Sequence, residues 1–376
     1  MKSKSLRHIA LHLPQFHPIP ENDEWWGKGF TEWTNVTQAR PLFEGHYQPH
    51  IPADLGYYDL RLEEAREAQA KIAQEYGIDG FCYYHYWFNG KRLLERPVDE
   101  ILSKGKPDFP YMLCWANDNW TRRWDGLDQE ILISHEYSPE DDVEHMKHLI
   151  KYFQDPRYIK VNNKPVFVLY KTFLLPDPEA TAKRWRAVAA ELGIELYLCH
   201  MVFGYNREWN RLVEGFDAVL DFEPFGVRRM GELRYSPKLK QAAKKRTIYD
   251  KIRDRIYPMN SIPEIIKKPN IFEYKSIYEQ LIPIKKTGLK MYPSLCPGWD
   301  NSARRNDDPS LILDDSTPAF FKEWYQKVAI DFEPYSEEEN FIFINAWNEW
   351  AEGNHLEPCG KWGYQYLEAI KAYLKS

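Results

Sequence analysis

Short apolar runs alternate with longer stretches of helical spacing along this chain, and the alternation repeats about eight times. Most of the runs are rich in β-branched or aromatic residues and are apolar at nearly every position. This is typical of parallel strands that are buried on both faces. The pattern predicts strands over residues 8–13, 80–86, 111–115, 165–170, 196–202, 218–222, 290–295 and 341–346.

The segments between these runs carry helix signals. Residues 62–76 place apolar side chains three and four positions apart, which predicts a helix with one apolar stripe. Ser138, Asp177 and Thr317 each precede a proline. This pairing is typical of a helix start, because the side-chain oxygen caps the first turn and proline suits its first position. We therefore expect a helix to begin after each of these three residues.

Strand followed by helix, repeated about eight times, favours a closed (β/α)8 TIM barrel of the α/β class. At 376 residues the chain is long enough for one such barrel, and we predict a single domain over residues 1–376. Two segments exceed a minimal barrel: a long loop after the first strand, residues 14–60, and a basic insertion after the sixth, residues 228–270. A doubly wound open sheet is the alternative, but the glycine-rich phosphate turn that it would need after an early strand is missing.

In a barrel of this kind, reacting groups come from the C-terminal ends of the strands and from the loops that follow. Polar and aromatic residues gather at these positions and in the long loop. We predict that the substrate-binding residues are His17, Trp26, His85, Trp87, Trp115, Asn117, Trp120, Tyr170, Glu223, Trp299, Arg304, Asn348 and Trp350. Gln15, Asp118 and Asn119 share the same rim. Some have a structural alternative: His85 as a core histidine, and Asn117 as a turn former.

Glu349 and Glu352 follow the eighth predicted strand, in the segment 345–353 (NAWNEWAEG). Cleavage of a glycosidic bond uses one carboxylic acid to protonate the departing oxygen and a second carboxylate at the anomeric centre. Tryptophan rings, which flank this pair, offer flat faces to sugar rings. We therefore predict Glu349 and Glu352 as the catalytic residues. The alternative is a pair of surface acids on a helical turn.

Composition and charge narrow the classes of function. Aromatic residues make up 15% of the chain, with 14 Trp and 25 Tyr, which is more than a core requires. Residues 228–268 hold 13 Lys or Arg against 4 Asp or Glu, although the whole chain has a net charge of -6. This segment is interpreted either as a solvated helical excursion or as a patch for a lipid-linked or phosphate-bearing acceptor. The acidic remainder argues against nucleic acid as a partner.

The sequence predicts no cofactor and no metal site. It contains neither a His-Glu-x-x-His nor a Cys-x-x-Cys pattern, and no Walker-type loop. Five cysteines cannot all pair, and four of them lie in apolar runs, which favours a reducing, cytoplasmic compartment. The first apolar stretch is too short for a secretory signal, and no run reaches the roughly 18 residues of a transmembrane helix.

Four aromatic segments, 13–18 (LPQFHP), 25–33 (WWGKGFTEW), 79–87 (DGFCYYHYW) and 115–120 (WANDNW), resemble those of the WbsX family. Members of that family are encoded in bacterial O-antigen and polysaccharide clusters and are usually described as glycosyltransferases. The resemblance covers nearly the whole chain. It implies a protein that acts on bacterial surface polysaccharide.

The last quarter of the chain also resembles glycoside hydrolase family 99, the endo-α-mannosidases and endomannanases, which are (β/α)8 barrels. The matching segments are 293–300 (PSLCPGWD), followed by Arg304, and 348–353 (NEWAEG), followed by Glu357. The hydrolases have histidine where this chain has Ala351, and their N-terminal halves differ from this one. The resemblance therefore does not extend to the identity of the sugar.

The hydrolase resemblance implies that Glu349 removes the proton of the sugar 2-hydroxyl and that Glu352 protonates the leaving oxygen. The 2-oxygen then closes on the anomeric carbon as a transient epoxide, which water opens with net retention. The spacing agrees with this. A double displacement on an enzyme carboxylate needs groups on opposite faces of the sugar, about 5 to 5.5 Å apart, whereas residues three apart on a tight turn project to the same side.

Three functions follow as hypotheses. The first is a retaining glycoside hydrolase acting on α-linked glycosides of bacterial surface polysaccharide. The second is a glycosyltransferase of polysaccharide or O-antigen biosynthesis, which would use the same acid pair but direct a sugar hydroxyl to the activated carbon. The third is a catalytically silent glycan-binding protein.

Overall fold

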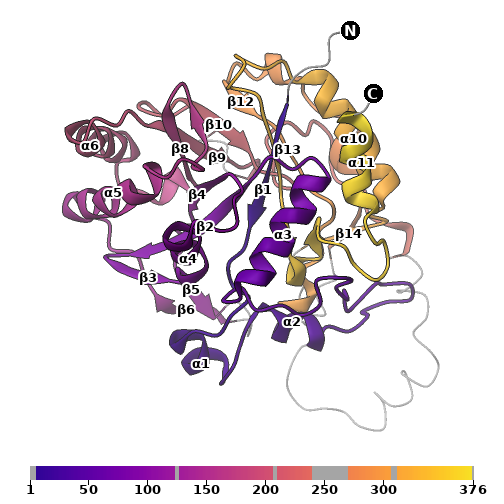
Figure 1. Ribbon diagram of the computed structural model, residues 1–376. Coiled ribbons are helices and arrows are strands. Elements are labelled where there is room, and N and C mark those ends of the chain that lie inside the picture. Colours follow the sequence, from indigo (N-terminus) through magenta and orange to yellow (C-terminus); the bar gives the residue numbers. More distant parts are fainter. Residues whose placement is uncertain (1–5, 123–126, 206–209, 239–269, 306–310, 375–376) are drawn as a thin grey trace.

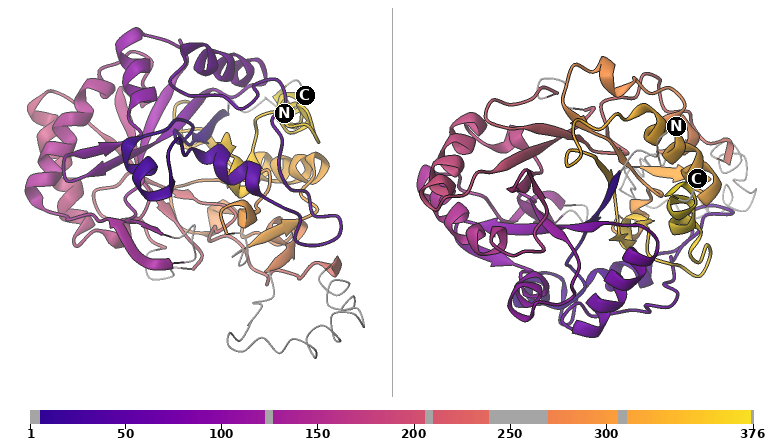
Figure 2. Two further views of the ribbon diagram at one scale, coloured as in Figure 1. Left: turned by 90° about the horizontal axis from the view of Figure 1, so that it is seen from below. Right: turned by 45° about the horizontal axis from the view of Figure 1, so that its top comes forward.

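The computed structural model describes residues 6–122, 127–205, 210–238, 270–305 and 311–374. Its centre is a ring of parallel strands, and helices surround this ring on the outside (Figures 1 and 2). The strands of the ring are β1 (Arg7–His12), β2 (Gly80–Phe88), β4 (Tyr111–Trp115), β8 (Lys164–Leu169), β9 (Tyr197–Val202), β10 (Ala218–Asp221), β12 (Met291–Tyr292), β13 (Ser294–Leu295) and β15 (Phe341–Ile344).

The ring closes through an interrupted strand. Neighbouring strands pair in the order β12, β10, β9, β8, β4, β2, β1, β15 and β13, and each of these pairs is parallel. Only Pro293 lies between β12 and β13, which pair with β10 and β15 respectively. Proline cannot donate a ladder hydrogen bond, so the seventh predicted strand is divided at this residue. The prediction of a (β/α)8 barrel is confirmed.

The helices that cover the outside of the ring are α3 (Glu63–Glu75), α4 (Arg96–Lys104), α5 (Pro139–Phe153), α6 (Pro178–Glu191), α10 (Pro318–Asp331) and α11 (Gln365–Leu374). Three of them begin at the predicted caps. The side chains of Ser138, Asp177 and Thr317 accept hydrogen bonds from backbone N–H groups three residues on, at 3.1, 2.9 and 3.3 Å. The amphipathic segment over residues 62–76 forms α3, as its spacing predicts.

The connections contain shorter elements. The long loop after β1 holds two helices, α1 (Pro20–Trp26) and α2 (Glu32–Gln38). The remaining elements are β3 (Lys91–Leu93), β5 (Trp120–Arg122), β6 (Leu127–Ile133), β7 (Lys160–Val161), β11 (Ile271–Glu273), α9 (Lys275–Tyr278), β14 (Ile312–Asp314), β16 (Asn348–Glu349), β17 (Asn354–His355) and the 3-10 turns η2 (Thr172–Leu174), η4 (Ile284–Lys286), η5 (Asn301–Ala303) and η6 (Trp350–Glu352). Of these elements, α1, β5, β6, β16 and η6 contribute residues to the cavity described below.

The basic insertion is described over residues 228–238 and at residue 270, and residues 239–269 lie outside the described residues. Its first residue has a structural role. Arg228 is buried and pairs with Asp221 at 2.8 Å and with Asp331 at 3.2 Å. This arginine therefore anchors the start of the insertion to the barrel, because a buried cation needs partners of opposite charge.

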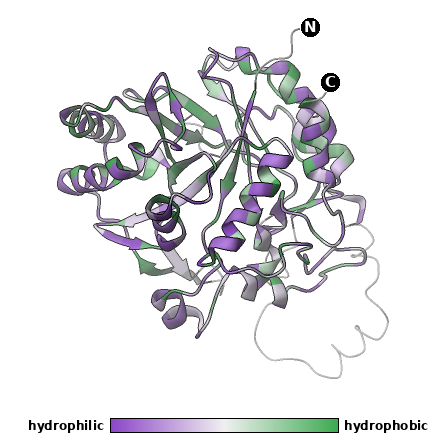
Figure 3. Ribbon diagram, in the orientation of Figure 1, coloured by the Kyte–Doolittle hydropathy of each residue, from purple (hydrophilic) through white to green (hydrophobic). Residues whose placement is uncertain are grey.

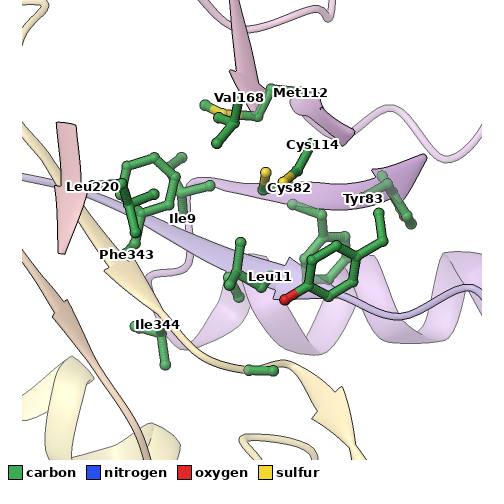
Figure 4. Packing of buried hydrophobic residues seen from close by; sticks show 14 of the residues in the cluster. Ile9, Leu11, Cys82, Tyr83, Met112, Cys114, Val168, Leu220, Phe343 and Ile344 are labelled. Atoms are coloured by element: carbon green, nitrogen blue, oxygen red, sulfur yellow. The ribbon is translucent and has the colours of Figure 1, made fainter. Parts of the chain in front are cut away.

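Buried apolar side chains hold the ring together. Figure 4 shows Ile9 and Leu11 of β1 among residues from other strands of the ring, including Cys82 of β2, Val168 of β8 and Phe343 of β15. Hydrophobic residues run along the ring strands, whereas the helices carry many hydrophilic residues (Figure 3). The five cysteines are buried and unpaired. Within the described part of the chain, no helix combines the length and the apolar character needed to cross a bilayer.

Candidate active site

A cavity of about 230 Å³ lies at the C-terminal ends of the ring strands. This is the end at which a (β/α)8 barrel is expected to carry its chemistry. The cavity is lined by Leu13, Gln15, Trp26, Tyr84, Tyr86, Ala116, Asp118, Asn119, Trp120, Thr121, Leu132, Tyr170, Phe222, Trp299, Arg304, Asn345, Glu349 and Glu352. The two glutamates predicted to be catalytic are thus among its lining residues, together with several aromatic side chains.

A tight turn presents these two glutamates. Glu349 ends β16, and Glu352 ends the 3-10 turn that connects β16 to its antiparallel partner β17. Gly353 closes the turn in the left-handed region with a φ of 57°, where a side chain would also lie 3.0 Å from the Cβ atom of Asp300. The N–H group of Asp300 donates to the carbonyl oxygen of Glu352 at 2.6 Å. The loop after β13 therefore holds the turn in place.

Arg304 joins both glutamates at the cavity. Its Nη2 donates to Oε2 of Glu349 at 2.8 Å, and its Nη1 donates to Oε1 of Glu352. Its Nε donates to Oε1 of Glu32 at 2.7 Å. One guanidinium group therefore bridges three carboxyl groups, a task to which its planar fork of donors is suited.

Burial dominates the electrostatics of this cluster. Burial raises the pKa of Glu349 to about 8; the charge of Arg304 opposes the shift, and Glu352 and Glu32 add to it. Burial also raises the pKa of Glu32. Burial disfavours the charged form of Arg304, but the three carboxylates outweigh this and hold its pKa well above the ordinary value. The cluster therefore combines a permanent cation with one glutamate, Glu349, that retains its proton near neutral pH.

Aromatic rings form much of the cavity wall. The predicted substrate-binding residues that line it are Trp26, Trp120, Tyr170, Trp299 and Arg304. Trp120 packs edge-on against Tyr86 with ring centroids 5.2 Å apart, and Tyr170 packs against Phe222 at 5.4 Å. Rings fixed in this way offer flat apolar faces to a ligand, while the nearby carboxyl and amide groups offer hydrogen bonds.

His85, Trp87 and Trp115 do not line the cavity, because they lie on the outer face of the ring against α5. Nε2 of His85 is 2.9 Å from Nε2 of His145. Nε1 of Trp87 donates to Asp141 at 2.9 Å, and the ring of Trp115 packs against His145 with centroids 4.6 Å apart. These three residues therefore belong to the contact between the barrel and α5.

The cavity side of β2 instead carries Tyr84 and Tyr86, which the sequence did not single out. Successive side chains of a strand point to opposite faces. A strand that is apolar at nearly every position gives no signal for which face looks inward. Asn345 and Glu32 were also missed. The only signal for Glu32 was its place in the segment 25–33, directly after a residue suited to cap a helix.

Asn348 and Asn117 use their amides to hold backbone beside the cavity. Oδ1 of Asn348 accepts from the N–H group of Leu13 at 2.7 Å, and its Nδ2 donates to the carbonyl oxygen of Leu13 at 3.0 Å. Asn117 pairs with the backbone of Lys171 in the same way, at 2.8 and 2.9 Å. Both side chains thus position loops of the rim and lie outside the cavity lining.

The other predicted binding residues also lie outside the lining. Nε1 of Trp350 donates to Glu357 at 2.6 Å, and its ring stacks on His355 with centroids 3.7 Å apart. His17 is buried, and burial lowers its pKa to about 4. Glu223 is buried as well, which raises its pKa to about 8. Within the described ranges, no group of three or more His, Cys, Asp or Glu side chains is arranged to hold a metal ion.

Known proteins resemble this chain in both sequence and fold. The family described as Glycosyltransferase WbsX matches residues 8–370. One relative is WxcX of Xanthomonas campestris pv. campestris (strain B100), which is described as an uncharacterized protein. It is 39% identical over 368 residues, which make up 97% of this chain and 49% of WxcX. The chain therefore spans about half the length of this relative.

Two solved structures share the fold. A GH99 endo-alpha-mannosidase from Bacteroides thetaiotaomicron superposes with a TM-score of 0.55 and 14% identity, covering 98% of this chain and 96% of the mannosidase. A chain described as a glycoside hydrolase-like protein gives a TM-score of 0.59 and 13% identity, covering 98% and 93%. The chain thus shares the barrel fold of these two structures, and by its sequence it belongs to the WbsX glycosyltransferase family.

Proposed function

We propose that this protein is a retaining carbohydrate-active enzyme that cleaves α-glycosidic linkages of a bacterial surface polysaccharide, with Glu349 as base and Glu352 as acid. The observation that carries the proposal is that Arg304 binds both glutamates within the cavity. Two carboxyl groups that share one guanidinium group lie on the same side of a bound sugar. This arrangement suits participation of the sugar's own 2-hydroxyl better than attack by an enzyme carboxylate from the opposite face.

In the first step, Glu349 takes the proton of the 2-hydroxyl as the 2-oxygen forms a bond to the anomeric carbon. The bond from that carbon to the leaving oxygen breaks, and Glu352 supplies the proton to the departing oxygen. In the second step, Glu352 takes a proton from the incoming hydroxyl group, whose oxygen bonds to the anomeric carbon. The bond between the anomeric carbon and the 2-oxygen breaks, and Glu349 returns its proton to the 2-oxygen. Two inversions give net retention.

The identity of the incoming hydroxyl group separates hydrolysis from transfer. Water gives hydrolysis, and a sugar hydroxyl gives transfer, the second candidate function, which the family description supports. The lipid-linked or phosphate-bearing acceptor and the cytoplasmic compartment belong to this second candidate and stay predictions. A catalytically silent glycan-binding protein is the third candidate, and the intact acid pair on Arg304 speaks against it.

The experiment that tests these functions offers defined α-manno- and α-rhamno-oligosaccharides to the protein, with and without nucleotide sugars, and follows the products by mass spectrometry. Shortened oligosaccharides in the absence of any donor would support the hydrolase. Product that forms only with a nucleotide sugar would reject the hydrolase in favour of the transferase. Glycan binding without product from any mixture would reject both enzymes.

The rate constant kcat/KM should rise with pH up to about 8. Glu349 must lose its proton to act as the base, and its pKa is raised to about 8, so the active form accumulates as the pH increases through that value. A pH profile of kcat/KM between about pH 6 and about pH 10 measures this rise and the pH at which it ends. A profile that falls over the whole range, with no rise between about pH 6 and about pH 8, would contradict the role of Glu349 as the base.

Replacing Trp120 by alanine should raise KM about tenfold, equal to roughly 1.4 kcal/mol of binding, and change kcat less. The ring lines the cavity beside Tyr86 and would be lost as a stacking face in ground state and transition state alike. Trp87→Phe is the matched control, since Trp87 faces α5 and its loss should affect stability without affecting KM. Equal changes of KM in both variants would contradict the conclusion that Trp120 lines the cavity and Trp87 faces α5.

A further inference from the structure

Glu32 contacts Arg304 of the candidate active site, although the two residues are 272 positions apart in the sequence. It opens α2 in the long loop after β1, far along the sequence from Arg304, yet its Oε1 accepts from Nε of Arg304 at 2.7 Å and forms an ion pair with Nη2 at 2.7 Å. Its side chain is 0% exposed, and Oε2 has no hydrogen-bond partner within the described residues. Glu32 does not line the cavity, so it does not meet a ligand directly.

The charges of this cluster do not balance. If Glu32, Glu349 and Glu352 were all ionised, three negative charges would surround the single positive charge of Arg304. A buried surplus of negative charge is strongly unfavourable, and such groups retain protons instead. Glu32 contributes one of these charges from the side of Arg304 that faces away from the cavity. A structural ion pair alone would need only one carboxylate.

Local structure holds Glu32 in this position. The side chain of Thr31 caps α2 in a reciprocal capping box with Thr34, and the N–H group of Glu32 donates to the carbonyl oxygen of Gln15 at 3.0 Å. Trp33, the next residue, donates from Nε1 to the carbonyl oxygen of Tyr58 at 2.8 Å. The backbone of Glu32 is therefore tied both to the end of β1 and to the helix start.

We propose that Glu32 is a positioning residue that fixes the Arg304 guanidinium group between Glu349 and Glu352, and that its negative charge makes the pair at the cavity hold a proton. The Nε edge of Arg304 binds Glu32, which leaves Nη1 and Nη2 to reach one cavity glutamate each. The charged and titratable groups that face Glu349 are Arg304, Glu352, Glu32, Tyr84 and Tyr86. Among the acids of this set, Glu32 alone lies outside the cavity lining.

The two parts of the proposal are separated by two substitutions. Glu32→Gln keeps the shape and an oxygen that accepts from Arg304 but removes the charge, whereas Glu32→Met removes the charge and the acceptor. With Glu32→Gln we expect the rise of kcat/KM with pH to occur at lower pH. A negative charge near Glu349 is removed, so the carboxylate of Glu349 forms more easily. With Glu32→Met we expect in addition a loss of kcat of at least about tenfold with KM little changed, because Arg304 loses its anchor.

The control is Glu24→Gln, which removes an exposed carboxylate from α1 of the same loop. Its pH profile and kcat should match those of the wild-type protein. Profiles of Glu32→Gln and wild-type protein that superpose would overturn the charge role. Equal kcat in Glu32→Met and Glu32→Gln would overturn the anchoring role.

The activity readout rests on the proposed function, so a second readout does not use activity. A buried carboxyl group with a raised pKa binds its proton more tightly in the folded state, so its contribution to stability is full at acidic pH and is lost as the pH rises. The melting temperature of the wild-type protein should therefore fall more steeply than that of Glu32→Gln between about pH 5 and about pH 8. If no glycan is ever turned over but the two curves diverge in this way, the charge role stands and the proposed function fails. Parallel curves would overturn the charge role whatever the activity.

Discussion

Glu349→Gln should lower kcat by about 10²- to 10⁴-fold and should leave the protein folded. Glutamine has the same shape and keeps an oxygen to accept from Nη2 of Arg304, a contact of 2.8 Å in the native protein, but it cannot take a proton from the substrate. The substitution also removes a carboxyl group whose pKa is raised to about 8. The wild-type protein therefore loses stability as the pH rises from the ordinary glutamate value of 4.5 to about 8, whereas the glutamine variant does not, so the stability of the variant relative to the wild-type protein should increase over this range and level off above it.

Glu352→Gln should reduce turnover of natural glycans by a similar factor, and the leaving group distinguishes the two residues. An aryl glycoside whose phenol departs without protonation does not need the acid. It should restore the first step, and with it the release of phenol, in Glu352→Gln but not in Glu349→Gln, whereas the second step stays slow because Glu352 is also its base. The rate of phenol release in the first turnover, compared with the steady-state rate and with circular dichroism to confirm the fold, provides the measurement. Restoration of activity in Glu349→Gln instead would exchange the two roles.

Arg304→Met should destabilise the protein by about 3–5 kcal/mol near neutral pH and abolish turnover. Methionine fills part of the space but leaves Glu32, Glu349 and Glu352 without their common cation. The pKa values of Glu32 and Glu349, which the charge of Arg304 lowers in the native protein, then rise further, so the variant should be least impaired at acidic pH and most impaired at alkaline pH. The loss should develop from the ordinary glutamate value of 4.5 to beyond the value of about 8 in the intact cluster.

Chemical denaturation of the wild-type protein and the variant at several pH values tests this prediction. Arg304→Met combined with Glu32→Gln should recover part of the lost stability, because one of the three unpaired carboxyl groups is removed. A single variant that unfolds at the same denaturant concentration as the wild-type protein at every pH would show that the cluster does not depend on the arginine. Such a result would remove the electrostatic basis of the proposed function.

The strands of the barrel could be predicted because each is a continuous apolar run, and the capped helices because Ser138, Asp177 and Thr317 act within one turn of their own positions. Interactions of such short range can be predicted from neighbouring residues in the sequence. The break of the seventh strand at Pro293 was recognisable in principle by the same reasoning, since a proline removes one ladder donor. The helices α1 and α2 lacked comparable apolar periodicity.

The candidate site was predicted in part. The two glutamates at the cavity were found because their spacing and their place after the eighth strand carry the signal. The choice between Tyr86 and Trp87 failed because adjacent aromatic residues in a strand apolar on both faces look alike in the sequence. The place of Asn348 outside the cavity lining could not be predicted, because its hydrogen bonds reach Leu13, 335 positions away in the sequence, and no local pattern indicates them.

The amino-acid order alone therefore specified the strands of the ring, the helices with an apolar stripe or a capped start, the barrel that they form, and the rim on which the acid pair lies, since all of these follow from periodicity and short-range bonding. Closure of the ring decided the rest. It determines which face of β2 lines the cavity. It also brings Arg304 of the seventh loop into contact with Glu32 of the first loop and Glu349 of the eighth. Contacts between residues so distant in the chain depend on the whole ring being assembled, because only the assembled ring sets where each loop ends in space.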